Sequence, residues 1–247
     1  MEKGQPINVC VPTGNFGNIL SAYYAKQMGV PIHKLICASN QNNVLTDFIK
    51  TGVYDRNRPF YNTMSPSMDI LISSNLERML FEFTERDDVA VKEYMSALAA
   101  EGRYEVSEKV KKQLDKTFAA GCCGDAETQA MIAKMWKEKG YLIDTHTAVA
   151  FHVLEEYRRE TGDDTPALVA STASPFQVLR QRAGRPGCDR PGFRHRHPGS
   201  ALPGHRRPGA RPSGRTEGKD RPVRSGHREG GHGRPGAGDA PVTVRRR

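Results

Sequence analysis

The residues best suited to chemistry in this sequence form one glycine-containing loop, Gly14-Asn15-Phe16-Gly17-Asn18. The loop follows an apolar run at residues 7–11, which is typical of a short buried strand, and it precedes a helical pattern. Two glycines allow a sharp turn and let the main chain come close to a ligand. The N-terminus of the next helix adds unpaired N–H donors and a partial positive charge. The loop is therefore predicted to bind a phosphate dianion.

The loop matches neither of two familiar phosphate-binding motifs. It lacks the Gly-x-x-x-x-Gly-Lys-Ser/Thr spacing for nucleoside triphosphates and the Gly-x-Gly-x-x-Gly spacing for dinucleotides. By spacing alone, a tight strand-to-helix turn without a ligand explains it equally well. His146 and His152 are six residues apart, a poor spacing for metal ligands. We therefore expect no metal site and assign both histidines to the core or the surface.

Alternating strand and helix patterns must position the loop. Helical spacing at residues 19–28 is followed by a strand at 34–38 and by a helix that ends at Gly52. This β-α-β-α order predicts an α/β fold with a parallel sheet. Further helices are expected at residues 69–84, 89–101, 106–118, 127–139 and 147–160, and a further strand at 167–171.

Two helices carry apolar residues at helical spacing. In the first, Leu20, Tyr23, Tyr24 and Met28 lie near one face. In the helix at 127–139, Ile132 and Trp136 are four residues apart, so they share a face and are expected in the core. Ser174 followed by Pro175 predicts one more helix start.

The composition changes sharply after Phe176. The whole chain has 247 residues and a net charge of +9. Residues 1–176 carry 19 basic and 23 acidic side chains, whereas residues 177–247 carry 17 Arg and one Lys against five acids. The second segment also holds 14 of 24 Gly and 9 of 16 Pro, and it lacks Ile, Met, Tyr, Trp and Asn. We expect a globular domain at 1–176 and a disordered tail at 177–247.

The tail has two explanations. An Arg-rich disordered arm would attract phosphate backbones without sequence preference. Alternatively, the tail is the product of a reading-frame slip, because Arg, Gly, Pro and Ala all have GC-rich codons. The tail contains only one aromatic residue, a Phe, so it lacks the interleaved aromatic side chains on which bases stack. We therefore favour the frame slip and do not expect a nucleic-acid partner.

No segment predicts a membrane span, an export signal or a disulfide framework. The chain has no run of 18 apolar residues, and its N-terminus lacks a charged-then-apolar pattern. Five scattered cysteines without C-x-x-C spacing fit a reducing cytoplasm. We expect a cytoplasmic protein without a membrane partner.

Seven segments together resemble the threonine synthases, in collinear order between residues 6 and 176. They read VPTGNFGN at 11–18, KLICASN at 34–40, NVLTDF at 43–48, SPSMD at 65–69, SSNLER at 73–78, DTHTAVA at 144–150 and STASPF at 171–176. Such a collinear series is far more specific than the loop alone.

The resemblance implies an incomplete, three-layer, parallel-sheet domain of the tryptophan-synthase-like type that binds pyridoxal 5'-phosphate (PLP). The residues that it implies for the cofactor phosphate are Gly14, Asn15, Phe16, Gly17 and Asn18. Thr172 would hydrogen-bond the pyridine nitrogen, although a backbone-bonded turn threonine is the alternative. Thr172 follows a strand, and ligands of open α/β sheets lie at such strand ends. The implied reaction converts O-phospho-L-homoserine and water to L-threonine and phosphate.

The chain also departs from the family. The family's Schiff-base lysine lies well before the phosphate loop in an aromatic-Lys-Asp setting, and Lys3 is not in such a setting. We therefore assign no catalytic residue. Gln177 stands where the family usually has lysine, and there the resemblance ends. We expect a C-terminal part of the enzyme that cannot turn over substrate alone and that exposes a sheet edge and apolar surface.

Two other functions remain open. One is another PLP lyase of the same fold, such as a serine/threonine dehydratase, although the segments at 43–48 and 65–78 speak against it. The other is a non-catalytic protein whose basic tail binds nucleic acid or anionic surfaces.

Overall fold

The computed structural model describes residues 4–176, and the expected tail at 177–247 lies outside the described residues. The strands are β1 (Ile7–Pro12), β2 (Ile32–Ser39), β3 (Val53–Asp55), β4 (Arg103–Glu105), β5 (Phe118–Cys122) and β6 (Ala167–Val169). The helices are α1 (Gly17–Gln27), α2 (Val44–Thr51), η1 (Pro66–Met68), α3 (Leu76–Phe83), α4 (Asp88–Glu101), α5 (Glu108–Thr117), α6 (Asp125–Lys139) and α7 (Thr145–Thr161).

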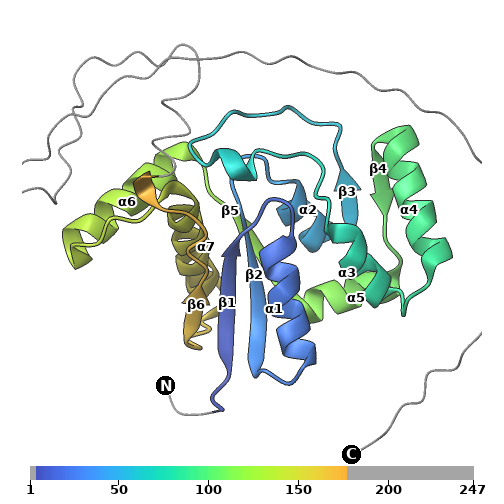
Figure 1. Cartoon of the computed structure of the whole chain (residues 1–247), viewed down its shortest axis with the longest axis horizontal. Helices are drawn as coiled ribbons and strands as arrows, with labels where there is room; N and C mark the ends of the chain where they lie inside the picture. Colours follow the sequence, from blue (N-terminus) through green and yellow to red (C-terminus); the bar gives the residue numbers. More distant parts are fainter. Residues whose placement is uncertain (1–3, 177–247) are drawn as a thin grey trace, which may run out of the picture. The chain divides into compact units, whose positions relative to one another are not determined.

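The central sheet has the strand order β5-β2-β1-β6, and every neighbouring pair is parallel (Figure 1). Val11 pairs with Cys37 of β2, and Cys10 pairs with Val169 of β6. Strands β3 and β4 form a separate antiparallel pair. Because parallel strands end at the same edge, the segments that follow β1 and β6 meet at one side of the sheet.

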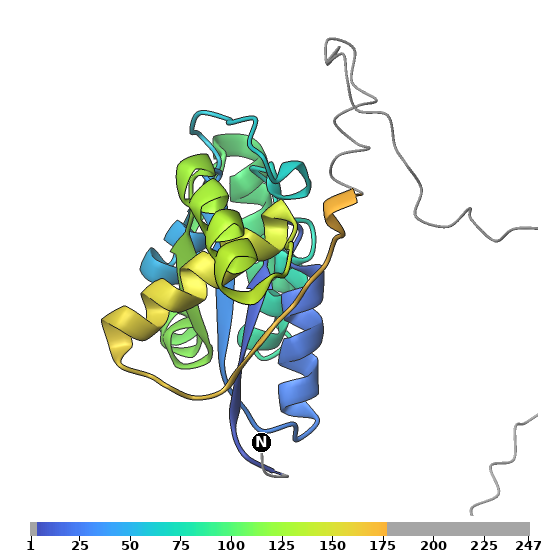
Figure 2. The same ribbon diagram turned by 90° about the vertical axis from the view of Figure 1, so that its left-hand side faces the viewer.

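Helices cover both faces of this sheet, which gives three layers (Figures 1 and 2). Val9 and Val11 face the core that α1 to α5 build, whereas Cys10 faces the core built with α7. Helix α6 packs on α7 through Met131, Ile143 and Ala148. A strand buried on both faces is rich in apolar residues, and β1 has that composition apart from Asn8, which is buried and hydrogen-bonded to Asp163. The predicted α/β class and three-layer order are confirmed.

The prediction of a helix at residues 69–84 is wrong for the first half of this range. Helix α3 begins only at Leu76, after the short 3-10 turn η1. The carboxylate of Asp69 accepts hydrogen bonds from Asn40, Asn42 and Thr63, so it ties the intervening loop to the end of β2. Side-chain bonds of this kind compete with helix formation.

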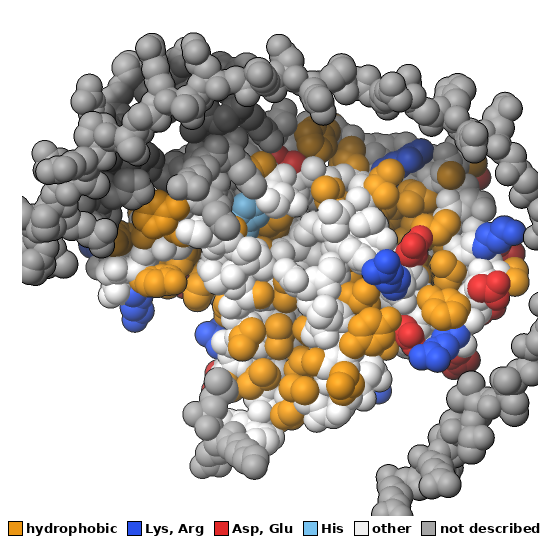
Figure 3. Space-filling model, viewed as in Figure 1, with side chains coloured by type: hydrophobic (Ala, Val, Ile, Leu, Met, Phe, Trp, Pro, Cys, Tyr) orange, Lys and Arg blue, Asp and Glu red, His pale blue; other side chains and the backbone are white. Residues whose placement is uncertain are grey.

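One expected core position is at the surface. Trp136, predicted in the core, is 59% exposed, because α6 packs through Met131 and Ile132 instead. On α1, Leu20 and Tyr23 are buried but Met28 is 86% exposed. Figure 3 shows hydrophobic side chains gathered over α1. Exposed and contiguous apolar patches commonly contact further protein.

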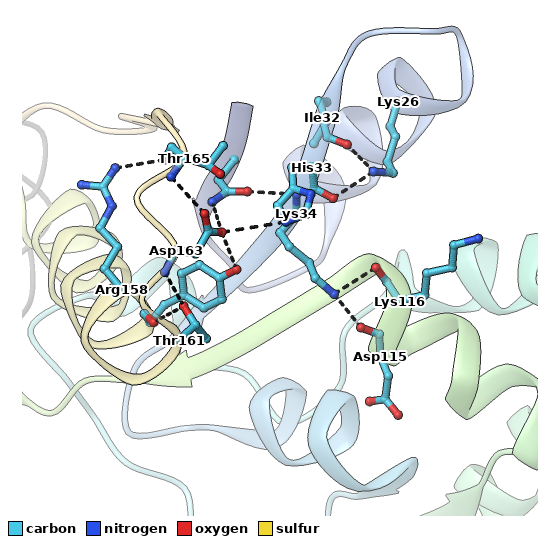
Figure 4. A network of polar contacts seen from close by, with 12 residues as sticks. Lys26, Ile32, His33, Lys34, Asp115, Lys116, Arg158, Thr161, Asp163 and Thr165 are labelled. Carbon is cyan, nitrogen blue, oxygen red and sulfur yellow. Dashed lines mark hydrogen bonds and ion pairs between the residues drawn. The ribbon is translucent and has the colours of Figure 1, made fainter. Parts of the chain in front are cut away.

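A polar network fastens the edge strand β6 to β1 at the end of the sheet opposite the loop (Figure 4). The carboxylate of Asp163 accepts hydrogen bonds from the Thr165 N–H at 2.9 Å, Asn8 Nδ2 at 2.8 Å and the Tyr157 hydroxyl at 2.8 Å. These donors hold the pKa of Asp163 well below its ordinary value, although partial burial opposes the shift. The network thereby fixes the strand that leads to Thr172.

Within residues 4–176, no helix combines the length and the apolar character that crossing a membrane requires.

Candidate functional site

A cavity of about 310 Å³ lies where β1 and β6 end and α1 begins. It is lined by Gly14, Asn15, Phe16, Gly17, Asn18 and Thr172. The structure therefore brings all six sequence-predicted site residues to one cavity, although Thr172 lies far along the chain from the loop. That they bind a cofactor stays a prediction. Ser67, Asn75 and His146 line the same cavity.

The sharp turn of the loop is made by Phe16 and not by a glycine. Phe16 has a φ of 62°, in the left-handed region that non-glycine residues seldom adopt. Its side chain is 1% exposed, and its ring lies 5.7 Å from that of Phe118, which fixes this conformation from the core side. Only the main chain of Phe16 is therefore left for a ligand.

A glycine is required at position 14 because the main chain at Ser67 lies close to it. A Cβ atom on Gly14 would lie 2.8 Å from the carbonyl oxygen of Ser67, which is too close for any residue with a side chain. A Cβ atom on Gly17 would meet only Asn75 Nδ2 at 3.6 Å, an ordinary contact. The two glycines of the motif thus have different physical roles, which their spacing did not reveal.

The first carbonyl groups of the loop accept hydrogen bonds from side chains, whereas its amides have no acceptor in the described chain. Ser73 Oγ donates to the Gly14 carbonyl at 2.9 Å, and Asn75 Nδ2 donates to the Asn15 carbonyl at 2.7 Å. In the described part of the chain, none of the main-chain N–H groups of residues 14–19 donates a hydrogen bond. Helix α1 also has no acidic residue in its first turn. Six consecutive amides at a helix N-terminus form a site for an anion.

His146, which we assigned to the core or the surface, lies in the wall of this cavity. It is 2% exposed, and its Nε2 atom is 3.3 Å from the main-chain nitrogen of Ser67. Its Nδ1 atom is 3.0 Å from Asp144 Oδ1. Sequence reasoning missed the contact because Ser67 is 79 residues away along the chain. The sequence does contain one signal, an Asp at the start of a helix with a His two residues later.

Asp144 closes the N-terminus of α7. Its side chain accepts from the main-chain nitrogens of His146 and Thr147, at 2.8 and 3.2 Å, and from the Thr147 hydroxyl. Burial raises the pKa of Asp144, but hydrogen bonds from His146 and Thr147 outweigh it and lower the pKa below its ordinary value. Asp144 is therefore a carboxylate at neutral pH.

Thr172 lines the same cavity and is exposed. It follows β6, and its hydroxyl forms no hydrogen bond among residues 4–176. The preceding Ser171 is tied to α7, because Thr147 Oγ1 lies 3.2 Å from Ser171 Oγ. The Thr172 hydroxyl is thus available to a ligand in the cavity.

The cavity wall carries almost no charge. Of the described residues that line it, His146 is the one with an ionisable side chain, and none is a lysine, arginine or carboxylate. Within residues 4–176, no group of three or more His, Cys, Asp or Glu could hold a metal ion. An anion here would be bound by main-chain dipoles and hydroxyl groups.

The chain is similar to proteins named threonine synthase. It is 47% identical over 171 residues to threonine synthase-like 1 of Homo sapiens, covering 69% of this chain and 23% of that protein. It is 38% identical over 189 residues to threonine synthase of Pseudomonas aeruginosa, covering 74% of this chain and 40% of that protein. No protein-family model matches the chain. The matched part of the chain thus spans between about a quarter and two fifths of the length of these relatives.

Solved structures show the same likeness. A PLP-bound threonine synthase from Brucella melitensis has a TM-score of 0.67 and 40% identity, over 71% of this chain and 37% of that one. Yeast threonine synthase has a TM-score of 0.65 and 33% identity, over 74% of this chain and 40% of that one. Over about 70% of its length, the chain is therefore a homologue of the threonine synthases and has their parallel-sheet α/β fold.

Proposed function

We propose that this chain is the PLP-binding part of a threonine synthase-like lyase, with the cofactor phosphate held by the loop of residues 14–19. The observation that carries the proposal is the row of six main-chain N–H groups without an acceptor in the described chain. A structural neighbour that is 40% identical is described as PLP-bound. Helix α1 adds the partial positive charge that favours a dianion.

The residues present fit this cofactor. Gly14, Asn15, Phe16, Gly17 and Asn18 would hold its phosphate through their N–H groups, Phe16 by its main chain alone. The Thr172 hydroxyl would hydrogen-bond the pyridine nitrogen. A neutral hydroxyl at that nitrogen leaves it unprotonated, which tunes the electron-sink chemistry that PLP supplies when bound.

The proposed reaction converts O-phospho-L-homoserine and water to L-threonine and phosphate. This chain's contribution is to bind and orient the cofactor in a cavity without charged side chains, apart from His146 when it is protonated. Because no lysine, arginine or carboxylate lines the cavity, the loop amides would be the main groups that bind the phosphate dianion.

We also propose that the 247-residue chain binds cofactor but does not turn over substrate. No lysine of residues 4–176 lines the cavity, so the described part lacks the amine that forms a Schiff base and moves the substrate proton. A phosphate-release assay on the purified chain is expected to show no turnover. Turnover above the background of a buffer control would contradict this part of the proposal.

Pyridoxine 5'-phosphate tests the binding site directly, because it lacks the aldehyde that reacts with surface lysines. Calorimetric titration is expected to show saturable binding of this compound at one site. Unphosphorylated pyridoxine is expected to bind at least about 100-fold more weakly, because charge-assisted hydrogen bonds to the phosphate are lost. Equal affinity for the two compounds would show that the loop does not recognise phosphate.

The comparisons do not favour a basic nucleic-acid-binding protein, because the matched relatives carry threonine synthase names. We retain the cytoplasm as the proposed compartment. In support, Cys10, Cys37, Cys122 and Cys123 are free thiols, as a reducing compartment would keep them.

A further inference from the structure

His146 is a buried ionisable side chain at the cavity that the proposed function leaves without a role. It lies in the first turn of α7, which begins at Thr145, and only 2% of it is exposed. Buried histidines that are not metal ligands need partners for both ring nitrogens. Both partners of His146 are present, and together they determine which nitrogen carries the proton.

The hydrogen bonds of His146 define a neutral ring with its proton on Nδ1. The Ser67 main-chain N–H group can only donate, so His146 Nε2, at 3.3 Å from this nitrogen, must accept and carries no proton. Nδ1 then donates to Asp144 Oδ1 at 3.0 Å. In the described chain, His146 is the acceptor for the Ser67 N–H, because the bonds that close η1 come from Met68 and Asp69.

The main chain at Ser67 also lies against the phosphate loop. The Ser67 carbonyl oxygen is 2.8 Å, and Met68 Cα 3.3 Å, from the position of a Cβ atom on Gly14. The Ser67 main chain therefore contacts Gly14 through its carbonyl group and His146 through its N–H group, and these two groups belong to the peptide units on either side of Ser67 Cα. A change at His146 Nε2 is transmitted to the loop through one residue, Ser67.

The ionisable groups on the elements next to His146 already have hydrogen-bond partners of their own. On α7 itself, Asp144 binds the helix N-terminus as described above. Beyond η1, the Asp69 carboxylate is engaged by Asn40, Asn42 and Thr63. On β1, Cys10 Sγ contacts the Ala150 carbonyl at 3.3 Å, and burial keeps this thiol protonated by raising its pKa. The loop at 171–173 contributes no ionisable side chain.

We propose that His146 is a positioning residue, which holds the main chain at Ser67 against the phosphate loop and releases it when Nε2 is protonated. A protonated Nε2 is a donor and cannot accept from the Ser67 N–H, so two donors would face each other. This inference rests on the proposed function only for its consequence, which is that release weakens phosphate binding. The contact itself is testable without a ligand.

The first experiment measures hydrogen exchange of the Ser67 amide in the ligand-free full chain by NMR. Wild-type Ser67 is expected to be protected, and His146→Leu should lower its protection factor about tenfold, because the acceptor is gone. His146→Gln, whose Oε1 can accept in place of Nε2, should keep most of it. His152→Gln changes a half-buried histidine further along α7 and should have no effect.

The wild-type protein alone also answers the question if a variant does not fold. Its Ser67 protection factor, corrected for intrinsic exchange, should be lower at about pH 5 than at about pH 8, because a protonated Nε2 cannot accept the Ser67 N–H. In His146→Gln it should stay constant. Equal Ser67 protection in wild type at both ends of this interval would overturn the inference.

The second experiment measures affinity for pyridoxine 5'-phosphate over the same pH interval. The ligand phosphate titrates equally with both proteins, so the ratio of wild-type to His146→Gln affinity isolates His146. We expect this ratio to fall several-fold as the pH is lowered. A ratio that rises would identify His146 as a cationic phosphate ligand and would contradict the positioning role. If neither protein binds the compound, the proposed function fails while the exchange experiment still decides the contact.

Discussion

Residues at the N-termini of two helices line the same cavity, and only one of these N-termini has a side-chain cap. Helix α7 begins at a cap, Asp144, whose carboxylate accepts from two main-chain amides. Helix α1 begins after Phe16, which is left-handed and provides no side-chain cap. A cap of this kind usually stabilises a helix by about 1 kcal/mol, so an uncapped end is a local loss of stability. The difference suggests that α7 serves as the support and α1 as the binding end.

The loop before α1 is nevertheless held by hydrogen bonds to its carbonyl groups and by the packing of Phe16. Ser73 and Asn75 bind the carbonyls of Gly14 and Asn15, and the Phe16 ring is anchored in the core. The amides are therefore preorganised without being used. Preorganised donors bind an anion without a further ordering cost.

The largest effect is expected from filling the space beside Gly14. In Gly14→Ala, the new methyl group would collide with the Ser67 carbonyl and displace the loop. We expect an affinity for pyridoxine 5'-phosphate lower by about 100-fold, measured by calorimetry, because several amide bonds lose their geometry together. Gly17→Ala is the matched control, since its methyl group has room, and it should bind within a few-fold of wild type. Similar losses in both variants would refute the distinction between the two glycines.

Removing the N-terminal cap of α7 should lower the free energy of unfolding. Asp144→Ala removes the helix cap and the partner of His146 Nδ1 at once. We expect the free energy of unfolding to fall by about 2–3 kcal/mol in urea titrations. Asp144→Asn keeps an acceptor oxygen and should lose less. An unchanged unfolding midpoint in Asp144→Ala would mean that α7 does not depend on its cap.

A smaller, pH-dependent effect is expected at the far end of the sheet. The pKa of Asp163 is lower in the folded chain than its ordinary value of about 3.9, so its stabilisation is complete above that value. It is lost as the pH falls below about 4 toward the folded-state pKa. Asp163→Asn should cost about 1–2 kcal/mol at pH 7 and should flatten this part of the stability profile. Parallel profiles for the two proteins in acid would contradict the role of the network.

The smallest effect is expected at Thr172. Its hydroxyl would make one hydrogen bond to the ring nitrogen, so Thr172→Val should weaken pyridoxine 5'-phosphate binding by about three- to tenfold. Thr172→Ser retains the hydroxyl and serves as the control in the same titrations. Equal affinities for the Val and Ser variants would remove Thr172 from the proposed site.

Much of the sheet could be predicted because β-branched and apolar runs mark β1 and β2, and because Gly29 and Gly52 end the helices before their neighbouring strands with positive φ. Strand β5 was missed because its sequence, Phe-Ala-Ala-Gly-Cys, is made mostly of small residues, and α5 runs directly into it. Strands β3 and β4 have three residues each, too few for a periodic signal.

The loop could be predicted from its residues, but its geometry could not. Nothing local to Gly14 indicates the Ser67 carbonyl beside it, and nothing local to His146 indicates that it accepts from the Ser67 N–H. Both contacts are made by the segment at 65–75, which the periodicity assigned partly to a helix. Long-range contacts of this kind depend on tertiary packing and have no local pattern.

The most direct test of the central claim follows the backbone amide resonances of the full chain while pyridoxine 5'-phosphate is added. The account predicts that the largest downfield proton shifts occur at residues 14–19, because these amides gain a charged acceptor. The capped amides of His146 and Thr147 should shift much less. Large shifts elsewhere with residues 14–19 unchanged would contradict the assignment of this loop as a phosphate site.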